Sequence, residues 1–320
     1  MKNNPKVTVI IPTYNRAHLI QRSVNSVLNQ SYKNLELLVI DDASTDSTEQ
    51  RISEIRDERL KYIRNKVNLG PSRSRNRGIE FSTGEIIAFQ DSDDEWYRDK
   101  LEKQVDMLLK SPEDVAAVYC GMEFIDIKNG VKIGEDRQND NFEVDFIYGS
   151  HLPHTPPTVT VLIKKSVLDE VGYFDERLRA AEDTELAMRV SKKYHYGYVN
   201  EILLKVARNH NSLMSNVKNY TISKEIIIEK HKDFLSKEIL FSLCKEVANY
   251  YILKGDYKKA KEYIKKSFMF KIDLKTFFQY SAILFTPTLI KYSYRKKYKK
   301  GIPHPNFAGQ FITDDSYKDY

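Results

Sequence analysis

The sequence contains little cysteine and no long apolar run. Of its 320 residues only Cys120 and Cys244 are cysteines, which excludes a disulfide framework and a cysteine-ligated zinc site. No stretch of 18 or more apolar residues occurs, and no signal-peptide pattern follows Met1, so the sequence predicts neither a membrane span nor secretion. We therefore expect the chain in a reducing cytoplasm.

Three signatures of nucleotide and hydrolase chemistry are also absent. No G-x-x-x-x-G-K-[ST] loop occurs, which argues against a P-loop ATPase. No G-x-G-x-x-G follows the first predicted strand, which argues against a dinucleotide cofactor, and no G-x-S-x-G elbow is present. The composition, 41% hydrophobic and 30% charged, is typical of a soluble globular protein.

The net charge of +6 is unevenly distributed along the chain. Residues 222–300 contain 19 lysines and arginines against 8 acids, whereas the remainder contains 32 basic and 37 acidic residues. This asymmetry predicts that the basic part faces a polyanion or an anionic surface. Nucleic acid is not the expected partner, because no recognised reading motif accompanies the charge.

Strands and helices alternate in the first part of the sequence. Compact aliphatic runs predict buried strands at residues 6–11, 35–40 and 85–89, and residues 60–64 are predicted to form a short further strand. Helical spacing or capping residues predict helices at 17–30, 48–55 and 72–81. The alternation predicts an α/β fold with a mainly parallel central sheet flanked by helices, and ligands at the carboxyl ends of its strands.

The second part is less regular. Strands are predicted at 116–120, 158–163, 196–199 and 203–206, and helices at 101–109, 165–171 and 183–191. Residues 128–157 are rich in Asn, Asp, Gly, His and Pro, which predicts a long loop region.

From about Tyr220 the pattern is all-helical, and Asn249–Phe268 resembles one tetratricopeptide unit, too little for a repeat protein. We expect a catalytic domain at 1–219, a helical domain at 220–300 and an irregular tail at 301–320.

Two carboxylates, Asp91 and Asp93, directly follow the predicted strand 85–89. In extended backbone, residues two apart point to the same face, so both carboxylates can reach one ligand. Hard oxygen ligands suit Mg²⁺ or Mn²⁺, which also bind substrate phosphates. Two acids in a turn are common at protein surfaces, but their position after a buried strand favours a metal site.

Two other polar clusters lie in the first part. Asp41 and Asp42 follow strand 35–40 and either accept hydrogen bonds from a nucleobase or ribose or belong to a helix-capping loop. Asn68 precedes Arg73, Arg75 and Arg77 at a predicted helix start, where arginines suit a diphosphate. The alternative for these arginines is a solvated basic face.

Two further candidates lie in the second part. Asp183, beside Glu182, opens a predicted helix, where its carboxylate either deprotonates a hydroxyl or caps the helix. Spacing alone does not separate these roles. His210 is a candidate to bind a metal or contact phosphate, although a lone histidine more often does neither.

Taken together, these segments resemble the bacterial family 2 glycosyltransferases, which have the GT-A fold. Five segments match in the family's order: Val7–Arg16, Leu37–Asp46, Asn68–Ile79, Gly84–Asp94 and Gly172–Asp183. The resemblance covers about residues 6–215 and implies inverting transfer from a nucleoside-diphosphate sugar, usually a UDP-sugar. The chain lacks the Q-x-x-R-W motif of the processive members, so we expect one sugar transferred per encounter.

The resemblance also implies roles for individual residues. Asp183 would be the general base, and Glu182 would contact acceptor or sugar beside it. Asp93, with His210 as a looser match, would bind Mn²⁺ or Mg²⁺. The residues implied to bind the nucleotide sugar are Pro12, Tyr14, Arg16, Asp41, Asn68, Arg75, Asp91 and Ser92.

The expected function is therefore transfer of one sugar to a glycan or lipid-linked glycan acceptor, in cell-surface polysaccharide or glycoconjugate synthesis. Residues 128–157 are expected to carry acceptor contacts or a lid. The alternatives are a non-catalytic sugar-nucleotide-binding or scaffolding protein, and a nucleotidyltransferase, whose glycine- and basic-rich loop is missing after the first strand. The basic C-terminal region is expected either to dock on an anionic membrane at the inner face of the cell membrane or to form a helical bundle or homo-oligomer contact.

Overall fold

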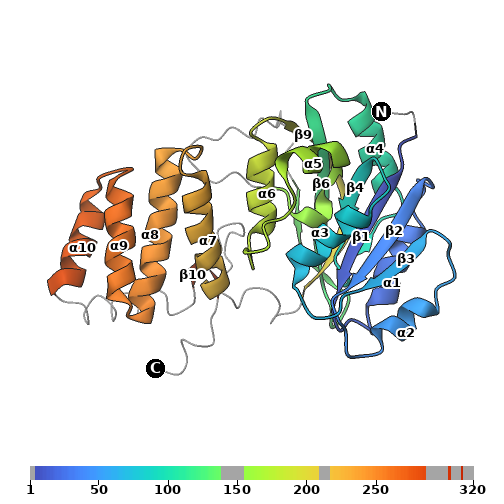
Figure 1. The fold of residues 1–320 in the computed structure, drawn as a ribbon, viewed down its shortest axis with the longest axis horizontal. Coiled ribbons are helices and arrows are strands. Elements are labelled where there is room, and N and C mark those ends of the chain that lie inside the picture. The colour runs from blue at the N-terminus through green and yellow to red at the C-terminus, as the bar shows by residue number, and fades with distance from the viewer. Residues whose placement is uncertain (1–3, 138–154, 209–216, 286–301, 304–310, 313–320) are drawn as a thin grey trace. The chain divides into compact units, whose positions relative to one another are not determined.

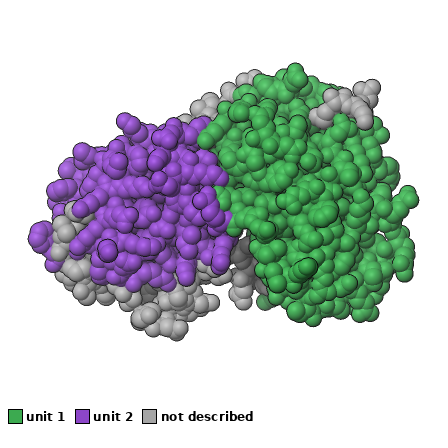
Figure 2. All heavy atoms as spheres, viewed as in Figure 1, with its two compact units in different colours: residues 1–146, 155–176, 182–210 green, residues 147–154, 177–181, 211–320 purple. Residues whose placement is uncertain are grey.

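The structure, a computed structural model, describes residues 4–137, 155–208, 217–285, 302–303 and 311–312. The chain divides into two compact units, which Figure 2 distinguishes by colour. Unit 1 comprises residues 1–146, 155–176 and 182–210 and contains the large sheet. Unit 2 comprises residues 147–154, 177–181 and 211–320 and is mainly helical. Figure 1 labels the elements of both units.

The first half of the sheet consists of four parallel strands. In space they follow the order β3 (Leu60–Arg64), β2 (Leu35–Asp41), β1 (Val7–Thr13) and β4 (Ile86–Phe89). β1 and β2 are in register from Val7 opposite Leu35 to Thr13 opposite Asp41. β1, β2 and β4 are buried almost throughout, as their aliphatic sequences predict.

Three helices connect these strands: α1 (Ile20–Leu28), α2 (Thr48–Ser53) and α3 (Pro71–Phe81). α1 buries Ile20, Val24 and Val27, the period of an amphipathic helix. α3 begins after Gly70, whose φ of 87° is readily adopted by glycine, and with Pro71 in its first turn. α3 lies very close to β1, because a Cβ added at Gly78 would be 2.4 Å from Cγ2 of Ile10.

The second half of the sheet is mixed. The order continues from β4 through β8 (Leu162–Lys164), β6 (Val115–Asp126) and β9 (His195–Arg208) to β5 (Glu95–Trp96), while β7 (Lys132–Asp136) pairs with β6. β6 and β9 are parallel, whereas the pairs that involve β5, β7 and β8 are antiparallel. The predicted α/β class is confirmed, and the parallel pairing is concentrated in β3-β2-β1-β4 and β6-β9.

Three details differ from the strand and helix predictions. Residues 196–199 and 203–206 form one long strand, β9, with irregular register between them, because β6 pairs along its length. Residues 158–160 form a 3₁₀ turn before β8. β7 lies inside the predicted loop region 128–157, of which residues 138–154 fall outside the described residues.

Three further helices belong to unit 1: α4 (Lys100–Lys110), α5 (Lys165–Val171) and α6 (Glu182–Val190). A shared hydrophobic core joins β4, β6, α5 and α6, and its aromatic contact between Phe89 and Phe174 is edge-on at 5.3 Å. This packing fixes the end of β4 relative to the segment that leads into α6.

The helical unit consists of α7 (Val217–His231), α8 (Lys237–Lys254), α9 (Tyr257–Phe268) and α10 (Leu274–Phe285). α8 ends at Gly255 in the left-handed conformation, and the Asp256 side chain caps α9 by accepting from the Lys259 N–H. The tetratricopeptide-like segment Asn249–Phe268 thus consists of parts of two helices that meet at Gly255-Asp256. In the tail, β10 (Ile302–Pro303) pairs with β11 (Phe311–Ile312). Among the described helices, none is long and apolar enough to cross a membrane.

Replacing Gly78 with alanine tests the close packing of α3 on β1. Alanine normally favours a helix interior, but here its Cβ would overlap Ile10, so we expect Gly78→Ala to lower the free energy of unfolding by about 1–3 kcal/mol. Urea unfolding followed by circular dichroism measures the change. Gly134→Ala is the control, because its added Cβ meets only an ordinary contact at 3.5 Å from Phe124. A stabilised Gly78→Ala protein would contradict the close approach.

Candidate active site

The acidic clusters of unit 1 lie where strands end and helices begin. Asp41 is the last residue of β2, Asp91 is the second residue after β4, and Glu182 and Asp183 are the first two residues of α6. β2 and β4 both pair in parallel with β1, so their carboxyl ends lie at the same edge of the sheet. The predicted location of the site at this edge agrees with the rule for parallel α/β sheets.

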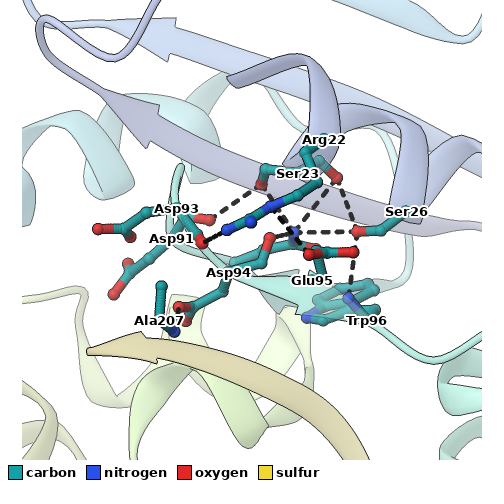
Figure 3. Close-up of polar contacts among 10 residues, drawn as sticks. Arg22, Ser23, Ser26, Asp91, Asp93, Asp94, Glu95, Trp96 and Ala207 are labelled. Atoms are coloured by element: carbon teal, nitrogen blue, oxygen red, sulfur yellow. Dashed lines mark hydrogen bonds and ion pairs between the residues drawn. The ribbon is translucent and has the colours of Figure 1, made fainter. Parts of the chain in front are cut away.

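The turn from Asp91 to Asp94 is held by α1. The Ser23 hydroxyl donates to the carbonyl of Asp91 at 2.9 Å, and the Arg22 guanidinium donates to the carbonyl of Asp93 at 2.8 Å. The buried Gln90 amide donates to the Ser23 hydroxyl and to the carbonyl of Asp94. Figure 3 shows this network. These bonds fix the backbone of the turn and leave the carboxylates of Asp91 and Asp93 for other partners.

The same helix also fixes the chain beyond the turn. The Ser26 hydroxyl accepts from the Trp96 N–H at 3.1 Å, and Arg22 forms an ion pair with Glu95 at 2.9 Å. Sequence reasoning assigned Arg22, Ser23 and Ser26 no role. A signal was present in the sequence, because Ser23 lies three residues after Ile20 and four before Val27, on the apolar face of the predicted helix, where a buried hydroxyl needs a partner.

The turn concentrates negative charge. Burial raises the pKa of Asp93, and the neighbouring carboxylate of Asp91 raises it further, while Arg16 opposes the shift from 3.9 Å away. Burial, Asp91 and Asp93 together raise the pKa of Asp94 well above its ordinary value. Asp94 points the other way and accepts a hydrogen bond from the Ala207 N–H of β9 at 3.0 Å. A cation beside Asp91 and Asp93 would relieve this repulsion.

The donor set fits a hard divalent cation in part. Asp91 and Asp93 extend to the same side of the turn in Figure 3 and offer the oxygen atoms that Mg²⁺ and Mn²⁺ prefer. Within the described part of the chain, no cluster of three or more His, Cys, Asp or Glu side chains could hold a metal ion. A cation that is completed by water and substrate phosphates needs only one or two carboxylates. The predicted ligand His210 lies outside the described residues.

Arg75 links the two acidic clusters. Its guanidinium group is buried and forms ion pairs at 2.9 Å with Asp91, after β4, and with Glu182, at the start of α6. It also lies over the ring of Phe174 at 5.6 Å. The resemblance implied that Arg75 lies near uridine and phosphate, and the structure places it between two carboxylates. Their charges raise its pKa although burial opposes this.

Asp183 has the properties of a group that exchanges a proton. Burial raises its pKa to about 6, and the adjacent carboxylate of Glu182 contributes in the same direction, while Arg75 opposes both. Its Oδ1 accepts from the Thr184 N–H at 2.7 Å. Asp183 is the second residue of α6 and therefore does not occupy the N-cap position. A carboxylate with a pKa near neutrality suits general-base catalysis.

The residues predicted to bind the nucleotide sugar differ in how exposed their side chains are to solvent. Tyr14 and Asn68 are exposed, and Pro12 and Arg16 are partly exposed, so their side chains are open to a ligand. Asp41 is fully buried, and its carboxylate accepts from the Ser44 N–H and from the Tyr62 hydroxyl. Sequence reasoning missed Tyr62, whose pKa is raised by burial and by Asp41.

Asp42 has a structural position. Its carboxylate accepts from the N–H groups of Leu69 and Gly70 and from the Asn65 amide, all within 2.9 Å. Asp42 therefore fixes the loop that precedes α3. Ser92 is also buried, in the middle of the acidic turn.

Three non-glycine residues with positive φ flank the site: Asn15 at 52°, Ala43 at 65° and Ala181 at 56°. Asn15 follows the Pro12–Tyr14 segment, Ala43 follows Asp41-Asp42, and Ala181 precedes Glu182-Asp183. Among the described residues these are all the non-glycine positions with positive φ. Such backbone costs about 1–3 kcal/mol per residue and persists where surrounding contacts impose it, commonly at functional sites.

The sheet, with its acidic turn after β4 and a second acid pair at the start of α6, defines the GT-A class of glycosyltransferases. Residues 8–172 match the model of the family described as glycosyl transferase family 2, slightly more than half of the chain. A Rickettsia typhi protein described as an uncharacterized glycosyltransferase is 33% identical over 224 residues, which are 68% of this chain and 69% of the relative. The chain therefore belongs to glycosyl transferase family 2.

Other relatives share less of their length or less identity. An Escherichia coli protein, the UDP-Glc:alpha-D-GlcNAc-diphosphoundecaprenol beta-1,3-glucosyltransferase WfgD, is 42% identical over 119 residues, which cover 37% of this chain and 46% of the relative. A Methanocaldococcus jannaschii uncharacterized glycosyltransferase is 26% identical over 298 residues, 90% of this chain and 92% of the relative. The chain spans 31 to 46% of the length of four curated relatives, three from Rickettsia and WfgD.

Two solved structures share the fold. Residues 1–349 of Staphylococcus aureus TarS superpose with a TM-score of 0.63 at 19% identity and cover 92% of this chain and 91% of that one. The mannosyltransferase PcManGT of Pyrobaculum calidifontis, solved with GDP-Man and Mn²⁺, gives a TM-score of 0.57 at 19% identity and covers 93% and 89%. At these identities the likeness concerns the fold alone.

Replacing Arg75 tests the link between the acidic clusters. Arg75→Met leaves Glu182, whose side chain is 18% exposed, without its partner, while the 41% exposed carboxylate of Asp91 can rehydrate, so we expect a loss of about 1–3 kcal/mol of stability. Arg73 lies on the same helix as Arg75 and forms an exposed ion pair with Glu176. Arg73→Met should therefore cost about 1 kcal/mol or less of stability. Equal urea midpoints for the two variants would contradict the structural importance of Arg75.

Proposed function

We propose that this chain transfers one sugar from a nucleoside-diphosphate sugar to an acceptor hydroxyl, with inversion at the anomeric carbon. The observation that carries the proposal is the pair of acidic clusters joined by Arg75, one fixed by α1 after β4 and the other at the start of α6. The first cluster suits the donor diphosphate and its cation, and the second contains a carboxylate with a pKa near 6.

We propose a UDP-sugar as donor. WfgD is named for the donor UDP-Glc, and TarS was solved with UDP-GlcNAc, which supports uridine, whereas PcManGT was solved with GDP-Man. The exposed side chains of Tyr14 and Asn68 are available for the nucleoside. Asp41 is fully buried and already accepts hydrogen bonds from Ser44 and Tyr62, so in the proposed nucleobase pocket it either accepts a further bond through a remaining lone pair or shapes the pocket from behind.

We propose that Asp93, together with Asp91, holds Mn²⁺ or Mg²⁺. The raised pKa of Asp93 and the partial ion pair with Arg16 are the supporting observations in this chain. When bound, such a cation neutralises charge on the leaving diphosphate. Arg16 and Arg22 lie beside the same turn, and Arg22 fixes its backbone. His210 keeps its proposed role as a metal or phosphate contact.

Asp183 is proposed as the base that takes the proton of the acceptor hydroxyl. The hydroxyl oxygen then attacks the anomeric carbon, and the diphosphate leaves on the opposite face, which gives inversion. At pH 7 a carboxyl group with a pKa of about 6 is mostly ionised and still binds a proton readily. Arg75 keeps Asp183 ionised, and Glu182 contacts Arg75.

The acceptor is proposed to be a glycan or lipid-linked glycan, in synthesis of cell-surface polysaccharide. The acceptor for which WfgD is named, alpha-D-GlcNAc-diphosphoundecaprenol, supports this class. Contact of the chain with an anionic membrane, or with a second copy of itself, remains part of the proposal.

Asparagine substitutions separate the two proposed roles. Asp93→Asn should remove most of the enhancement of UDP binding by Mn²⁺, as isothermal titration calorimetry measures, because one anionic ligand is lost. Asp183→Asn should bind UDP normally but lose about 10²–10⁴-fold in sugar transfer, because the base is removed. Asp106→Asn, at an exposed acid on α4, is the control for both. Full transfer by Asp183→Asn would disprove the base assignment, and unchanged Mn²⁺ dependence in Asp93→Asn would disprove the metal assignment.

The pH dependence of transfer provides a further test. A base must be ionised, so kcat/KM should fall about tenfold per pH unit below the pKa of Asp183, about 6, and level off above it. In Arg75→Met the falling limb should move to higher pH, because the guanidinium no longer favours the ionised carboxylate. Asp106→Asn should leave the limb in place. A limb at the same pH in Arg75→Met would contradict the electrostatic link.

A further inference from the structure

Helix α10 exposes several large apolar side chains. Thr276 and Ile283, seven residues apart, are buried against the rest of the helical unit. In contrast, Leu274, Phe277, Phe278 and Phe285 are 52 to 82% exposed. Positions 274, 277, 278 and 285 differ by three, four and seven residues, so they lie on one side of a helix. The exposed face of α10 is therefore an apolar stripe, the reverse of an ordinary surface helix.

The turn before α10 extends this stripe. Met269 and Ile272, between α9 and α10, are 76% and 80% exposed. We call these six residues the α10 apolar face: Met269, Ile272, Leu274, Phe277, Phe278 and Phe285. Large apolar side chains that are exposed together on one side of a helix and in the turn before it favour an interaction surface over scattered surface residues.

The start of α10 is anchored, so the orientation of this face is fixed within the helical unit. The Asp273 carboxylate accepts from the N–H and the hydroxyl of Thr276, which caps the helix. These bonds lower the pKa of Asp273 to about 2, and Lys245 of α8 lies 3.4 Å from the same carboxylate. The buried contacts of Thr276 and Ile283 then leave the apolar face outward.

The surroundings of the face are basic. Residues 217–285 contain 14 lysines, no arginine and 8 acids, a surplus of six positive charges. Lys271 is exposed between Met269 and Ile272, and Lys258 and Lys265 are exposed on α9. A long lysine side chain beside apolar residues can extend its ammonium group toward headgroups while its methylenes pack below them.

We propose that the α10 apolar face docks on the surface of an anionic lipid bilayer, with Phe277, Phe278 and Phe285 entering the headgroup region and the lysines contacting lipid phosphates. With large apolar side chains on its exposed face and exposed lysines beside it, α10 has the features of a helix that lies in the membrane plane. A second copy of the chain would carry the same positive surplus and be repelled, whereas anionic headgroups attract it. This inference deepens the membrane contact proposed above by assigning it to α10, and it does not depend on sugar transfer.

Vesicle flotation of the full chain tests the proposal. We expect binding to vesicles of phosphatidylglycerol and phosphatidylcholine that is roughly tenfold or more stronger than binding to phosphatidylcholine alone, and weaker at higher salt. The combined variant Phe277→Gln, Phe278→Gln, Phe285→Gln should lose roughly tenfold or more of this binding. All three side chains are exposed, so the variant should fold, which its circular dichroism melt checks.

The matched control is Val131→Gln with Ile133→Gln, two comparably exposed apolar residues at β7 in unit 1. This control should bind anionic vesicles like the unmodified chain. Failure of the unmodified chain to bind anionic vesicles at low salt would overturn the proposal, as would unchanged binding by the triple variant. Sedimentation velocity tests the other possible occupant, a second copy of the chain. If the unmodified chain forms a dimer, the triple variant disrupts that dimer and no vesicle binding occurs, this face is an interface between copies. No sugar nucleotide enters the assay, so its failure leaves the transferase proposal untouched.

Discussion

The two ion pairs of Arg75 connect parts of the site that are far apart in the sequence. Asp91 follows a central strand of the sheet, and Glu182 opens a helix about 90 residues later. A buried guanidinium group is fully charged and has a fixed geometry, so it can hold two carboxylates at defined positions. The proposed donor side and the proposed base are thereby set relative to each other by one side chain, and that side chain is set by α3.

In the acidic turn, one set of contacts holds the backbone and another set compensates the charges. Hydrogen bonds from Arg22 and Ser23 hold the backbone carbonyls, so the shape of the turn does not depend on a ligand. The charges are compensated only partly, since Arg16 lies at the limit of an ion pair with Asp93. An arrangement that is rigid but electrostatically unsatisfied is ready to bind a cation without rearrangement, because the cost of gathering the carboxylates has already been met by folding.

Much of the fold could be predicted from the sequence, because buried parallel strands are short aliphatic runs whose composition differs from their flanks. The acidic turn could be located for the same reason, since Asp91 follows such a run. The partners of these residues could not be predicted. Arg75 is polar on a helix and equally suits a phosphate or a solvated face, and only the tertiary fold brings Asp91 and Glu182 to it. Ser23 was missed because a serine in a helix is ordinarily a neutral surface choice.

The close approach of α3 to β1 has a consequence for sequence divergence. Space at Gly78 is limited by Ile10, whose side-chain atoms lie within 3.0 Å of where a Cβ would be. A larger residue at position 78 is therefore tolerable only where the residue at position 10 becomes smaller. The two positions should change together among relatives that keep the same distance between α3 and β1. Arg75 lies one turn before Gly78, so substitutions at positions 10 and 78 would shift the Arg75 guanidinium group along the sheet edge. Selection for the geometry of the site would therefore also act on this core contact, although neither residue touches a ligand.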